Sequence, residues 1–595
     1  MQAIPGIHLA TGQFHQALPA HSPWRREAAL PGRHLAGANL GQWLSARVDS
    51  RYESPQTHAT DEAGVTVLFE GYLTAVLEDG HPLEKPAATV LALFLDSGLP
   101  CLTRLRGSYS CLILDSRNNQ AHLFNDRRAS RPLFYRQSSD NAVLVGPEVF
   151  FLACADPPLA EIDPVAVCEF VLFASYYNER TLFPEIRKLP PASVLSLKPG
   201  SMELSRYWEI RIDADKPPLD EHECVEEAIA LFDQSIRRLL TGRSRPALLL
   251  SGGIDSRVIL GGLRRAGFRI PAVTYGTPDG DDAPIARQIA EHCGLPFTFH
   301  PIANDDPQNF FAASARRSDC RAETVDTPTH GEFIERLADH HDTYLHGDKS
   351  FLGKDAANPL QALARVDVLT FADTARLADM LDPDVRRHAQ ASIDQTRRDF
   401  LAAGADIDPQ DLKDKVYYEQ RLANRQNAFA AASLRDLEPA RPWLDEDLVD
   451  FLFAIPGHLR RDKDINRKML EIIAPDLAGM PFAKRDSIPQ ANTYRKQIPA
   501  NPVLADFIRT QFNEALDPRL GGLFRPGSLA ALAESLASGG PFPMQGLHWW
   551  YRLPGMWRMT AKRYSADRIH PVSIMLRLMQ LNLYLNALKT AKLDH

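Results

Sequence analysis

The chain has 595 residues, of which 44% are hydrophobic and 24% are charged, and its formal net charge is −8. This length predicts two or three domains, and the ordinary globular composition excludes fibrous and disordered proteins. The negative charge argues against a general nucleic-acid-binding protein.

Cysteine usage and hydropathy favour a cytoplasmic protein with no nucleic-acid partner and no membrane insertion. The seven cysteines are scattered without a C-x-x-C pair, which is typical of reduced thiols. The first residues, MQAIPGIHLATGQFHQ, lack the basic and apolar runs of a secretory signal. The stretch 572–588 is interrupted by Arg577 and three amide side chains, which predicts an amphipathic helix.

Short strands and turns are expected from residue 60 to about 210. The segments SYSCLILD (108–115) and AHLFN (121–125) flank a polar turn and predict a β-hairpin. Further strands are expected at 65–69, 142–146 and 192–197. The charged stretch 207–224 contains a Pro-Pro pair and is typical of a linker.

Strands and helices alternate after this linker. Strands are expected at 247–250, 272–275 and 297–301, with helices at 225–240, 257–266 and 283–293. This alternation predicts a doubly wound parallel sheet that binds ligands at the carboxyl ends of its strands. From about residue 360 onward the pattern is mostly helical.

The stretch LLLSGGIDS (248–256) predicts a phosphate site where a buried strand turns into a helix. Backbone N–H groups and the helix dipole attract an anion there, and paired glycines allow a close approach. The serine hydroxyls add donors, and the aspartate offers an oxygen ligand to Mg²⁺. The GxxxxGK[ST] spacing of a Walker loop is absent, and SGGIDS resembles the pyrophosphate loop of N-type ATP pyrophosphatases. The predicted ATP-binding residues of this stretch are Leu250, Ser251, Gly252, Gly253, Asp255 and Ser256.

Two further segments follow expected strands of the same sheet. The strand end that holds Val273 and Tyr275 is a candidate adenine site, where backbone groups would hold the base; the alternative is an ordinary strand with an acidic solvated loop. The loop YLHGDKSFLG (344–353) places Gly347 and Asp348 at another strand end. Asp255 and Asp348 are therefore predicted to hold Mg²⁺ from two sides, although a lone Gly-Asp pair is more often a plain turn.

Basic residues later in the chain are candidates for stabilising charge that develops during the reaction. Lys484, in MPFAKRDSIP (480–489), is the predicted catalytic cation. Arg467 or Lys468, in DKDINRKML (462–470), is the predicted phosphate contact. For any single lysine or arginine the alternative is a solvated surface charge.

Taken together, these segments resemble the asparagine synthetase superfamily. The resemblance rests on SGGIDS, on 273–276, on HGDKSFLG, on RPWLDEDLVDFLFAIP (441–456) and on the hairpin region 105–135, and it covers about residues 65–490. It implies an N-terminal nucleophile-type αββα sandwich over 1–209. It also implies an ATP pyrophosphatase-type doubly wound parallel sheet with a helical extension over 210–595, using ATP and Mg²⁺.

The departures from that family are informative. Glutamine-using members have a cysteine directly after the initiator methionine, whereas position 2 is Gln2 and the first cysteine is Cys101. A carboxamide cannot replace a thiolate nucleophile, so we expect a degenerate glutaminase-like domain. The second loop also lacks the family's longer run of glycines and acids. This branch resembles the β-lactam synthetases and the lasso-peptide macrolactam synthetases, which join a carboxylate to an amine of the same molecule.

Three hypotheses remain open. The first is a cyclase that forms an intramolecular amide, with a lasso-type precursor peptide or a small β-amino acid as substrate. A leader-peptide-binding protein and a protease are possible partners of such an enzyme. The second is intermolecular amidation with ammonia or an amine, on aspartate or a sugar acid. The third is a non-catalytic scaffold. Tyr344 and Glu323 are candidates for the general base.

Overall fold

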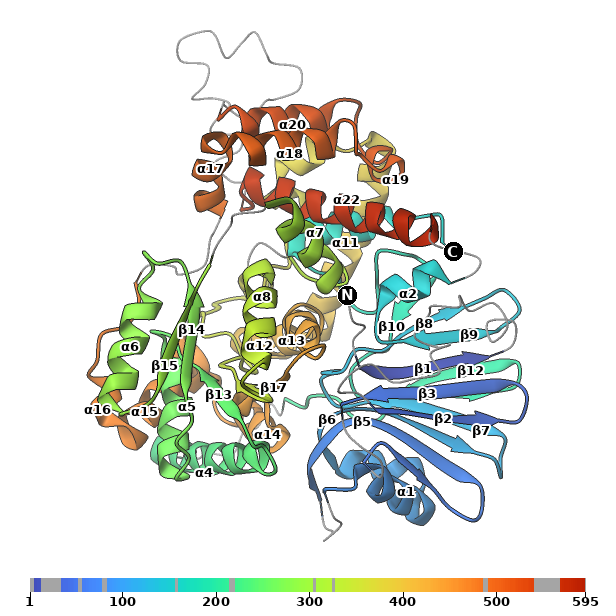
Figure 1. Cartoon of the computed structure of the whole chain (residues 1–595), viewed down its shortest axis with the longest axis vertical. Helices are drawn as coiled ribbons and strands as arrows, with labels where there is room; N and C mark the ends of the chain where they lie inside the picture. Colours follow the sequence, from blue (N-terminus) through green and yellow to red (C-terminus); the bar gives the residue numbers. More distant parts are fainter. Residues whose placement is uncertain are drawn as a thin grey trace.

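A computed structural model describes residues 5–11, 34–51, 56–77, 83–155, 159–212, 220–302, 307–323, 327–484, 491–539 and 568–593. Figure 1 shows three regions: an antiparallel β-sandwich, a parallel sheet flanked by helices, and a group of helices that includes α17, α18, α20 and α22. Gln2 and the aromatic segment 548–559 lie outside the described residues.

Two six-stranded sheets form the N-terminal sandwich. The first has the strand order β10-β8-β9-β1-β3-β2 and the second β12-β11-β7-β6-β5-β4, with antiparallel pairing. The strands are β1 (Gly6–Thr11), β2 (His34–Leu40), β3 (Leu44–Ser50), β4 (His58–Thr60), β5 (Val65–Val76), β6 (Leu105–Asp115), β7 (Gln120–Asn125), β8 (Phe134–Gln137), β9 (Val143–Gly146), β10 (Ile186–Lys188), β11 (Ser193–Lys198) and β12 (Ser201–Arg206). The predicted hairpin is confirmed as β6 and β7.

The alternation of side chains along each strand explains the layers. On β6, Leu112 and Leu114 pack in the core between the two sheets, whereas Ile113 faces α1 (Pro86–Ser97) and η3 (Leu99–Arg104) on the outer side. The outer side of the other sheet is covered by α2 (Val149–Cys154) and α3 (Pro164–Phe173). The predicted αββα sandwich is therefore confirmed.

The second sheet system is parallel. Its order is β15-β14-β13-β16-β17, from β13 (Pro246–Leu249), β14 (Ala272–Gly276), β15 (Phe297–Pro301), β16 (Thr343–Leu345) and β17 (Glu438–Ala440). Helices cover both faces: α4 (Glu221–Leu240), α5 (Ile254–Arg265), α14 (Glu446–Ala454) and α15 (Asp464–Ile473) contribute to one core, and α8 (Thr327–Ala338) to the other. This confirms the doubly wound sheet. The short strand β17 lies in a region that the sequence pattern indicated as helical.

The remaining chain is mostly helical, as expected. Its elements are α6 (Asp282–His292), α7 (Pro307–Arg317), α9 (Pro359–Arg365), η4 (Phe371–Asp373), α10 (Ala375–Met380), α11 (Pro383–Ala403), α12 (Pro409–Val416), the π-helix η5 (Tyr417–Gln426), α13 (Asn427–Ser433), η6 (Pro442–Leu444), η7 (Gly457–Lys463), α16 (Pro475–Ala478), α17 (Ala491–Ala500), α18 (Pro502–Phe512), α19 (Pro518–Gly521), α20 (Ser528–Ala537) and α22 (Pro571–Leu593). Among the described residues, no helix is both long and apolar enough to cross a membrane. One hydrophobic core joins α2 and α3 to α11, α18 and α22, so residues on both sides of position 209 pack together.

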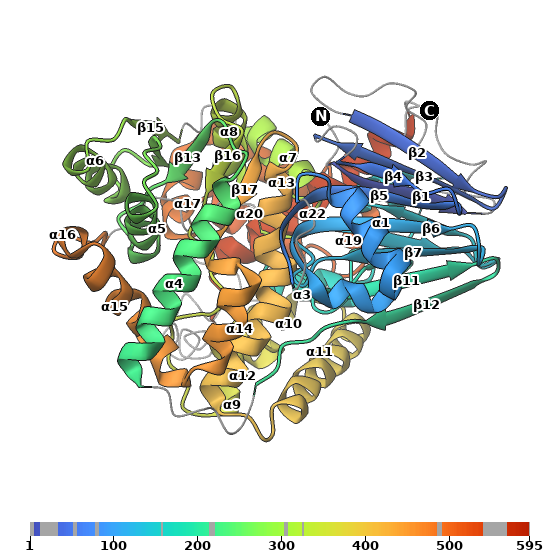
Figure 2. The same ribbon diagram turned by 90° about the horizontal axis from the view of Figure 1, so that it is seen from below.

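Arginine side chains of the sandwich also form ion pairs with residues of the second region. Figure 2 shows α14 next to the sandwich strands, and there Arg106 and Arg127 pair with Asp447 and Asp450. Arg131 is fully buried: its Nη1 donates to Glu70 at 2.9 Å, and its Nη2 donates to both oxygens of Glu438 at 2.8 Å. Because Glu438 begins β17, this ion pair holds the edge of the parallel sheet against the sandwich.

Candidate functional site

An open cavity lies where the winding of the parallel sheet reverses. Strands β14 and β15 extend to one side of β13, and β16 and β17 to the other. In doubly wound sheets this switch point, at the carboxyl ends of the strands, is where ligands bind. The cavity has a volume of about 250 Å³ and is open to solvent. It is lined by Leu249, Leu250, Ser251, Gly253, Asp255, Ser256, Val273, Thr274, Tyr275, Asp282, His346, Gly347 and Asp348.

The structure therefore brings three predicted segments together around this one cavity. The SGGIDS turn follows β13, the segment with Val273 and Tyr275 ends β14, and Gly347 and Asp348 follow β16. Gly252 lies in the same turn behind the lining residues, because a Cβ at this position would be 2.7 Å from the Cβ of Ala483. The assignment of the cavity to ATP stays a prediction.

The serine hydroxyls organise the turn itself. Ser256 Oγ accepts from the backbone N–H of Ser251 at 3.2 Å, and Ser251 Oγ accepts from that of Gly253 at 3.2 Å. The helix α5 begins at Ile254 and has no side-chain cap, so its first N–H groups are available to an anion. Asp282 Oδ1 accepts from the N–H of Gly252 at 2.7 Å and holds the turn to α6.

The tight packing behind Gly252 leads to a prediction. We expect Gly252→Ala to weaken ATP binding at least about tenfold, because the new methyl group must displace the turn or the segment at Ala483. Titration of the two proteins with ATP measures the effect. Gly479→Ala is the matched control, since the nearest atoms to its Cβ would be 3.9 Å away. Equal ATP affinity in Gly252→Ala and the unchanged protein would contradict the packing argument.

Asp255 is the most heavily contacted acid of the site. Its carboxylate lies 2.9 Å from Nζ of Lys463 and 3.3 Å from Nζ of Lys349, and it accepts from Nδ2 of Asn466 at 2.9 Å. Burial alone would raise the pKa of Asp255, but the charges of Lys349 and Lys463 outweigh it and hold the pKa below its usual range. Asp255 is therefore an anion at neutral pH, and two lysines are brought to the phosphate turn through it.

The backbone before α15 is shaped to deliver one of these lysines. Asp462 and Lys463 have φ values of 48° and 58°, in the left-handed region that non-glycine residues rarely adopt. Such positions cost free energy and are found at functional sites, where the surrounding structure enforces them. Here the unusual backbone places Lys463 on Asp255, across 208 positions of sequence.

Asp348 has a different set of neighbours. His346 Nδ1 lies 3.3 Å from its carboxylate, and Arg441 Nη1 lies 3.8 Å away. Burial would lower the pKa of His346, but the negative charge of Asp348 outweighs this and raises it. Asp348 follows a strand that pairs directly with β13, and its neighbour Gly347 packs against Asp255 of the SGGIDS turn.

The two carboxylates can bind Mg²⁺ only together with other ligands. Among the described residues no group of three His, Cys, Asp or Glu side chains could hold a metal ion. Mg²⁺ in nucleotide sites needs only one or two carboxylates, because phosphate oxygens and water complete its shell, so Asp255 and Asp348 suffice. For Asp255 to bind the ion, one of its nitrogen donors must move to another partner.

Two of the three basic residues predicted from the sequence form ion pairs outside the cavity lining. Arg467 pairs with Asp464 at 3.1 Å, and Lys468 pairs with Glu221 at 2.6 Å and with Asp464 at 2.5 Å. Neither residue lines the cavity, and a phosphate contact by either of them stays a prediction. Lys468 lies on the part of α15 that faces α4, whereas Asn466 lies on the part that faces Asp255.

Lys484 lies next to the phosphate turn, but its side chain is exposed. Its backbone N–H donates to Asp281 at 3.0 Å, and that of Ala483 donates to the carbonyl of Gly252 at 3.2 Å. Residues 485–489 of the same predicted segment lie outside the described residues. The catalytic role of Lys484 stays a prediction.

Neither candidate for the general base is open to the cavity. The hydroxyl of Tyr344 donates to Ser433 at 2.9 Å, and burial raises its pKa far above the usual range. Glu323 is buried and ion-paired to Arg577 at 2.7 Å; the nearby arginines overcome the effect of burial and lower its pKa.

Five residues of the site were not predicted from the sequence. They are Lys349, Lys463, Asn466, His346 and Arg441. Two of them could have been predicted, because His346 and Lys349 flank the Gly347-Asp348 pair in the sequence. The others are far from the phosphate turn in sequence, and only the packing of α15 and β17 brings them to it.

Comparisons with known proteins agree with this arrangement. A family model described as asparagine synthase matches residues 227–556, and one described as glutamine amidotransferase domain matches residues 80–208. Asparagine synthetase [glutamine-hydrolyzing] 3 of Bacillus subtilis is 21% identical over 456 residues, which cover 69% of this chain and 72% of that protein. The Homo sapiens asparagine synthetase [glutamine-hydrolyzing] is 26% identical over 232 residues, 34% of this chain and 37% of its own length.

Among solved structures, glutamine phosphoribosylpyrophosphate amidotransferase of B. subtilis is matched with a TM-score of 0.18 and 13% identity, covering 43% of this chain and 51% of that one. NMN synthetase from Francisella tularensis is matched with a TM-score of 0.17 and 15% identity, covering 22% and 56%. The fold assignment comes from the strand orders above. Because the asparagine synthase model matches more than half of the chain, this protein belongs to the asparagine synthase family.

Proposed function

We propose that this protein is an ATP-dependent C–N ligase that activates a carboxylate as an adenylate, releases pyrophosphate, and closes an amide with an amine of the same molecule. Membership of the asparagine synthase family indicates ATP-dependent amide ligation in general. The single observation that carries the proposal is the cavity at the switch point, which joins the SGGIDS turn to the loop with Asp348.

The N-terminal sandwich supports an amine that does not come from glutamine. Gln2 stands where glutamine-using members have their cysteine, although it lies outside the described residues. Burial raises the pKa of two cysteines of the sandwich, that of Cys101 to about 12 and that of Cys111 well above its usual range, so neither of these two forms a nucleophilic thiolate.

The residues of the cavity have complementary roles in this proposal. The open N–H groups at the start of α5 would bind phosphate, and the backbone at the end of β14 would hold the adenine. Asp255 and Asp348 would hold Mg²⁺, which when bound neutralises part of the charge of the triphosphate. Lys349 and Lys463 would neutralise charge on the departing pyrophosphate, and Lys484 would stabilise the oxyanion formed when the amine attacks.

The test is substrate-dependent formation of AMP and pyrophosphate. We expect turnover with a precursor peptide, or a β-amino acid, whose product has lost 18 Da, and tandem fragmentation should locate the new amide within one molecule. Short open reading frames beside the gene supply the peptides to screen, and a leader-peptide-binding protein and a protease are the proposed partners. Ammonia-dependent amidation of aspartate or a sugar acid would instead establish the intermolecular alternative.

A further inference from the structure

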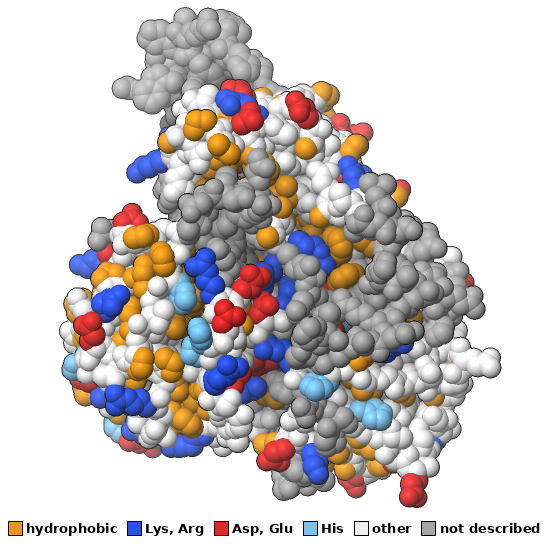
Figure 3. Space-filling model, in the orientation of Figure 1, with side chains coloured by type: hydrophobic (Ala, Val, Ile, Leu, Met, Phe, Trp, Pro, Cys, Tyr) orange, Lys and Arg blue, Asp and Glu red, His pale blue; other side chains and the backbone are white. Residues whose placement is uncertain are grey.

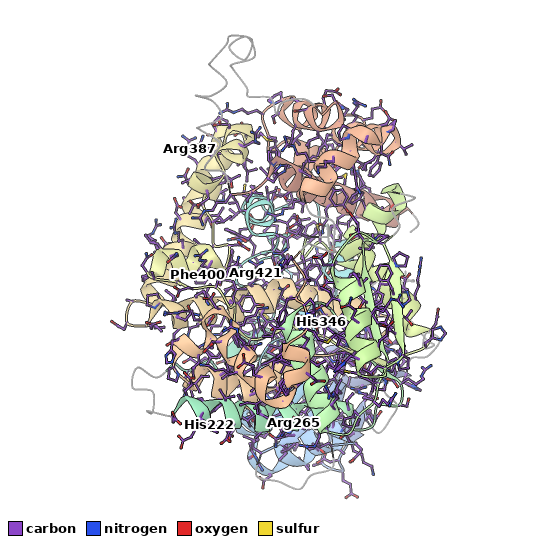
Figure 4. All side chains as sticks on the ribbon, turned by 90° about the vertical axis from the view of Figure 1, so that its left-hand side faces the viewer. His222, Arg265, His346, Arg387, Phe400 and Arg421 are labelled. Atoms are coloured by element: carbon purple, nitrogen blue, oxygen red, sulfur yellow. The ribbon has the colours of Figure 1, made fainter. Side chains whose placement is uncertain are left out.

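Three arginines gather beside the loop that carries Asp348. Arg421 and Arg425 project from the π-helix η5, and Arg577 projects from α22. Their side chains are 22%, 14% and 12% exposed, so each is mostly buried but can be reached by solvent. Figure 4 places Arg421 in the middle of the molecule, in the same region as His346 of the cavity. We call these residues the arginine cluster.

The carboxylates near the arginine cluster do not balance it. Arg421 pairs with Asp367, and Glu323 serves both Arg577, at 2.7 Å, and Arg425, at 3.7 Å. The Nε atoms of all three arginines are buried, and none has a hydrogen-bond partner among the described residues. Among the residues that the structure describes, the three guanidinium groups thus share two carboxylates, and each retains unused donors.

The pKa of Arg421 reflects the nearness of the other two cations. Burial, together with the charges of Arg425 and Arg577, lowers the pKa of Arg421 to about 9, whereas arginine is ordinarily charged at any pH in proteins. A fold does not gain stability from such crowding. An oxyanion between the guanidinium groups would relieve it, since each group can offer two parallel N–H donors to a carboxylate or phosphate.

The arginine cluster is connected to the candidate ATP cavity by continuous structure. Lys413 of α12 donates from Nζ to the carbonyls of Leu352 and Lys354, in the loop that follows Asp348. Helix α12 continues directly into η5, whose first residue, Tyr417, has its pKa raised by burial and by the charges of Asp348 and Asp255. Tyr417 at one end of the π-helix is therefore near enough to Asp348 and Asp255 to be influenced by their charges, and Arg421 and Arg425 follow along the same helix. Ten-residue π-helices are rare, and π-helical turns are concentrated at functional sites.

We propose that the arginine cluster binds an oxyanionic group of the acceptor substrate, a carboxylate or a phosphate other than the carboxyl group that is activated. The identity of the ligand as the acceptor rests on the proposed function, whereas anion binding by the cluster does not. Figure 3 shows acidic and basic side chains gathered in the middle of one face of the molecule, between the regions of the two sheet systems. A substrate held there would meet charged groups of both signs.

The test measures thermal stability of the full chain in the presence of two probes, sodium succinate and inorganic phosphate, at constant ionic strength with chloride as reference. We expect at least one probe to raise the melting temperature of the unchanged protein, because a ligand that binds only the folded state stabilises it. Arg421→Gln should abolish the shift, and Arg421→Lys should keep part of it. Arg387→Gln is the matched control, since Arg387 is 78% exposed and pairs only with a neighbouring aspartate of the same helix.

Each outcome decides a point. A shift with succinate assigns the site to a carboxylate, and a shift with phosphate alone assigns it to a phosphate. The inference is overturned if neither probe shifts the unchanged protein, or if Arg421→Gln responds equally. It is also overturned if Arg421→Gln without probe is markedly less stable, because removal of one repelling cation should leave stability unchanged or higher. ATP titration of the same proteins separates this result from the proposed function: Arg421→Gln should bind ATP normally.

Discussion

Asp255→Asn is expected to lose at least about 99% of substrate-dependent pyrophosphate release, a fall of roughly 100-fold or more. The carboxylate of Asp255 holds Lys349, Lys463 and Asn466 at the phosphate turn. An amide at this position cannot pair with two ammonium groups, and it offers a much weaker oxygen ligand to Mg²⁺. We therefore also expect the Kd for ATP with Mg²⁺ to rise at least about tenfold.

The control for this prediction is Asp279→Asn. Asp279 is exposed in the acidic loop between β14 and α6 and does not line the cavity, so its loss removes the same charge without touching the site. If Asp255→Asn does not fold, Lys463→Gln provides a second variant, since it removes one contact and leaves Lys349 on Asp255. The nucleotide binds elsewhere if ATP affinity and pyrophosphate release are both unchanged in Asp255→Asn. The same conclusion follows from Lys463→Gln if Asp255→Asn does not fold.

Arg131→Gln is expected to destabilise the protein by about 3–5 kcal/mol, the usual cost of removing one partner from a buried ion pair. Arg131 is surrounded by Glu70, Glu438 and the carbonyl of Ser108, to which its Nε donates at 3.1 Å. Burial raises the pKa of Glu70 to about 7 against the opposing charge of Arg131, whereas Glu438 is held below its usual pKa because Arg131 and Arg243 outweigh burial. Without Arg131, Glu438 would be left as a poorly compensated buried anion.

Denaturant unfolding monitored by fluorescence measures the loss, read from the first transition because the chain has more than one domain. Arg117→Gln is the matched control: its pair with Asp115 at 2.8 Å has a similar length, but the arginine side chain is 39% exposed, and we expect no measurable change. Because Glu438 begins the strand that precedes Arg441, we also expect slower turnover in Arg131→Gln. Stability equal to that of Arg117→Gln would refute a structural role for this ion pair.

The architecture was predictable because its strands and helices follow from local patterns in the sequence. Two strand-like segments that flank a polar turn indicated the hairpin β6–β7, and the alternation of strands and helices after residue 224 indicated the doubly wound sheet. The strands β1, β2 and β3 were not predicted. The sequences of β2 and β3 contain histidine, asparagine, arginine and glycine at positions that the sandwich leaves partly exposed, so the apolar pattern is weak there, whereas β1 is buried throughout.

The residues of the site also fall into two groups, those that local sequence patterns predict and those that they do not. The sequence by itself determined the phosphate turn and its partners at the ends of β14 and β16, because glycines at a turn and polar residues after a strand are local requirements of such a site. Only the tertiary structure decided which cations reach it. Lys468 lies on the side of α15 turned toward Glu221 and α4, and Arg467 pairs with Asp464 of its own helix. Lys463, in contrast, reaches Asp255 through a left-handed backbone that no periodicity reveals. Contacts across some two hundred positions depend on how helices pack, and helix packing is not encoded in any short stretch of sequence.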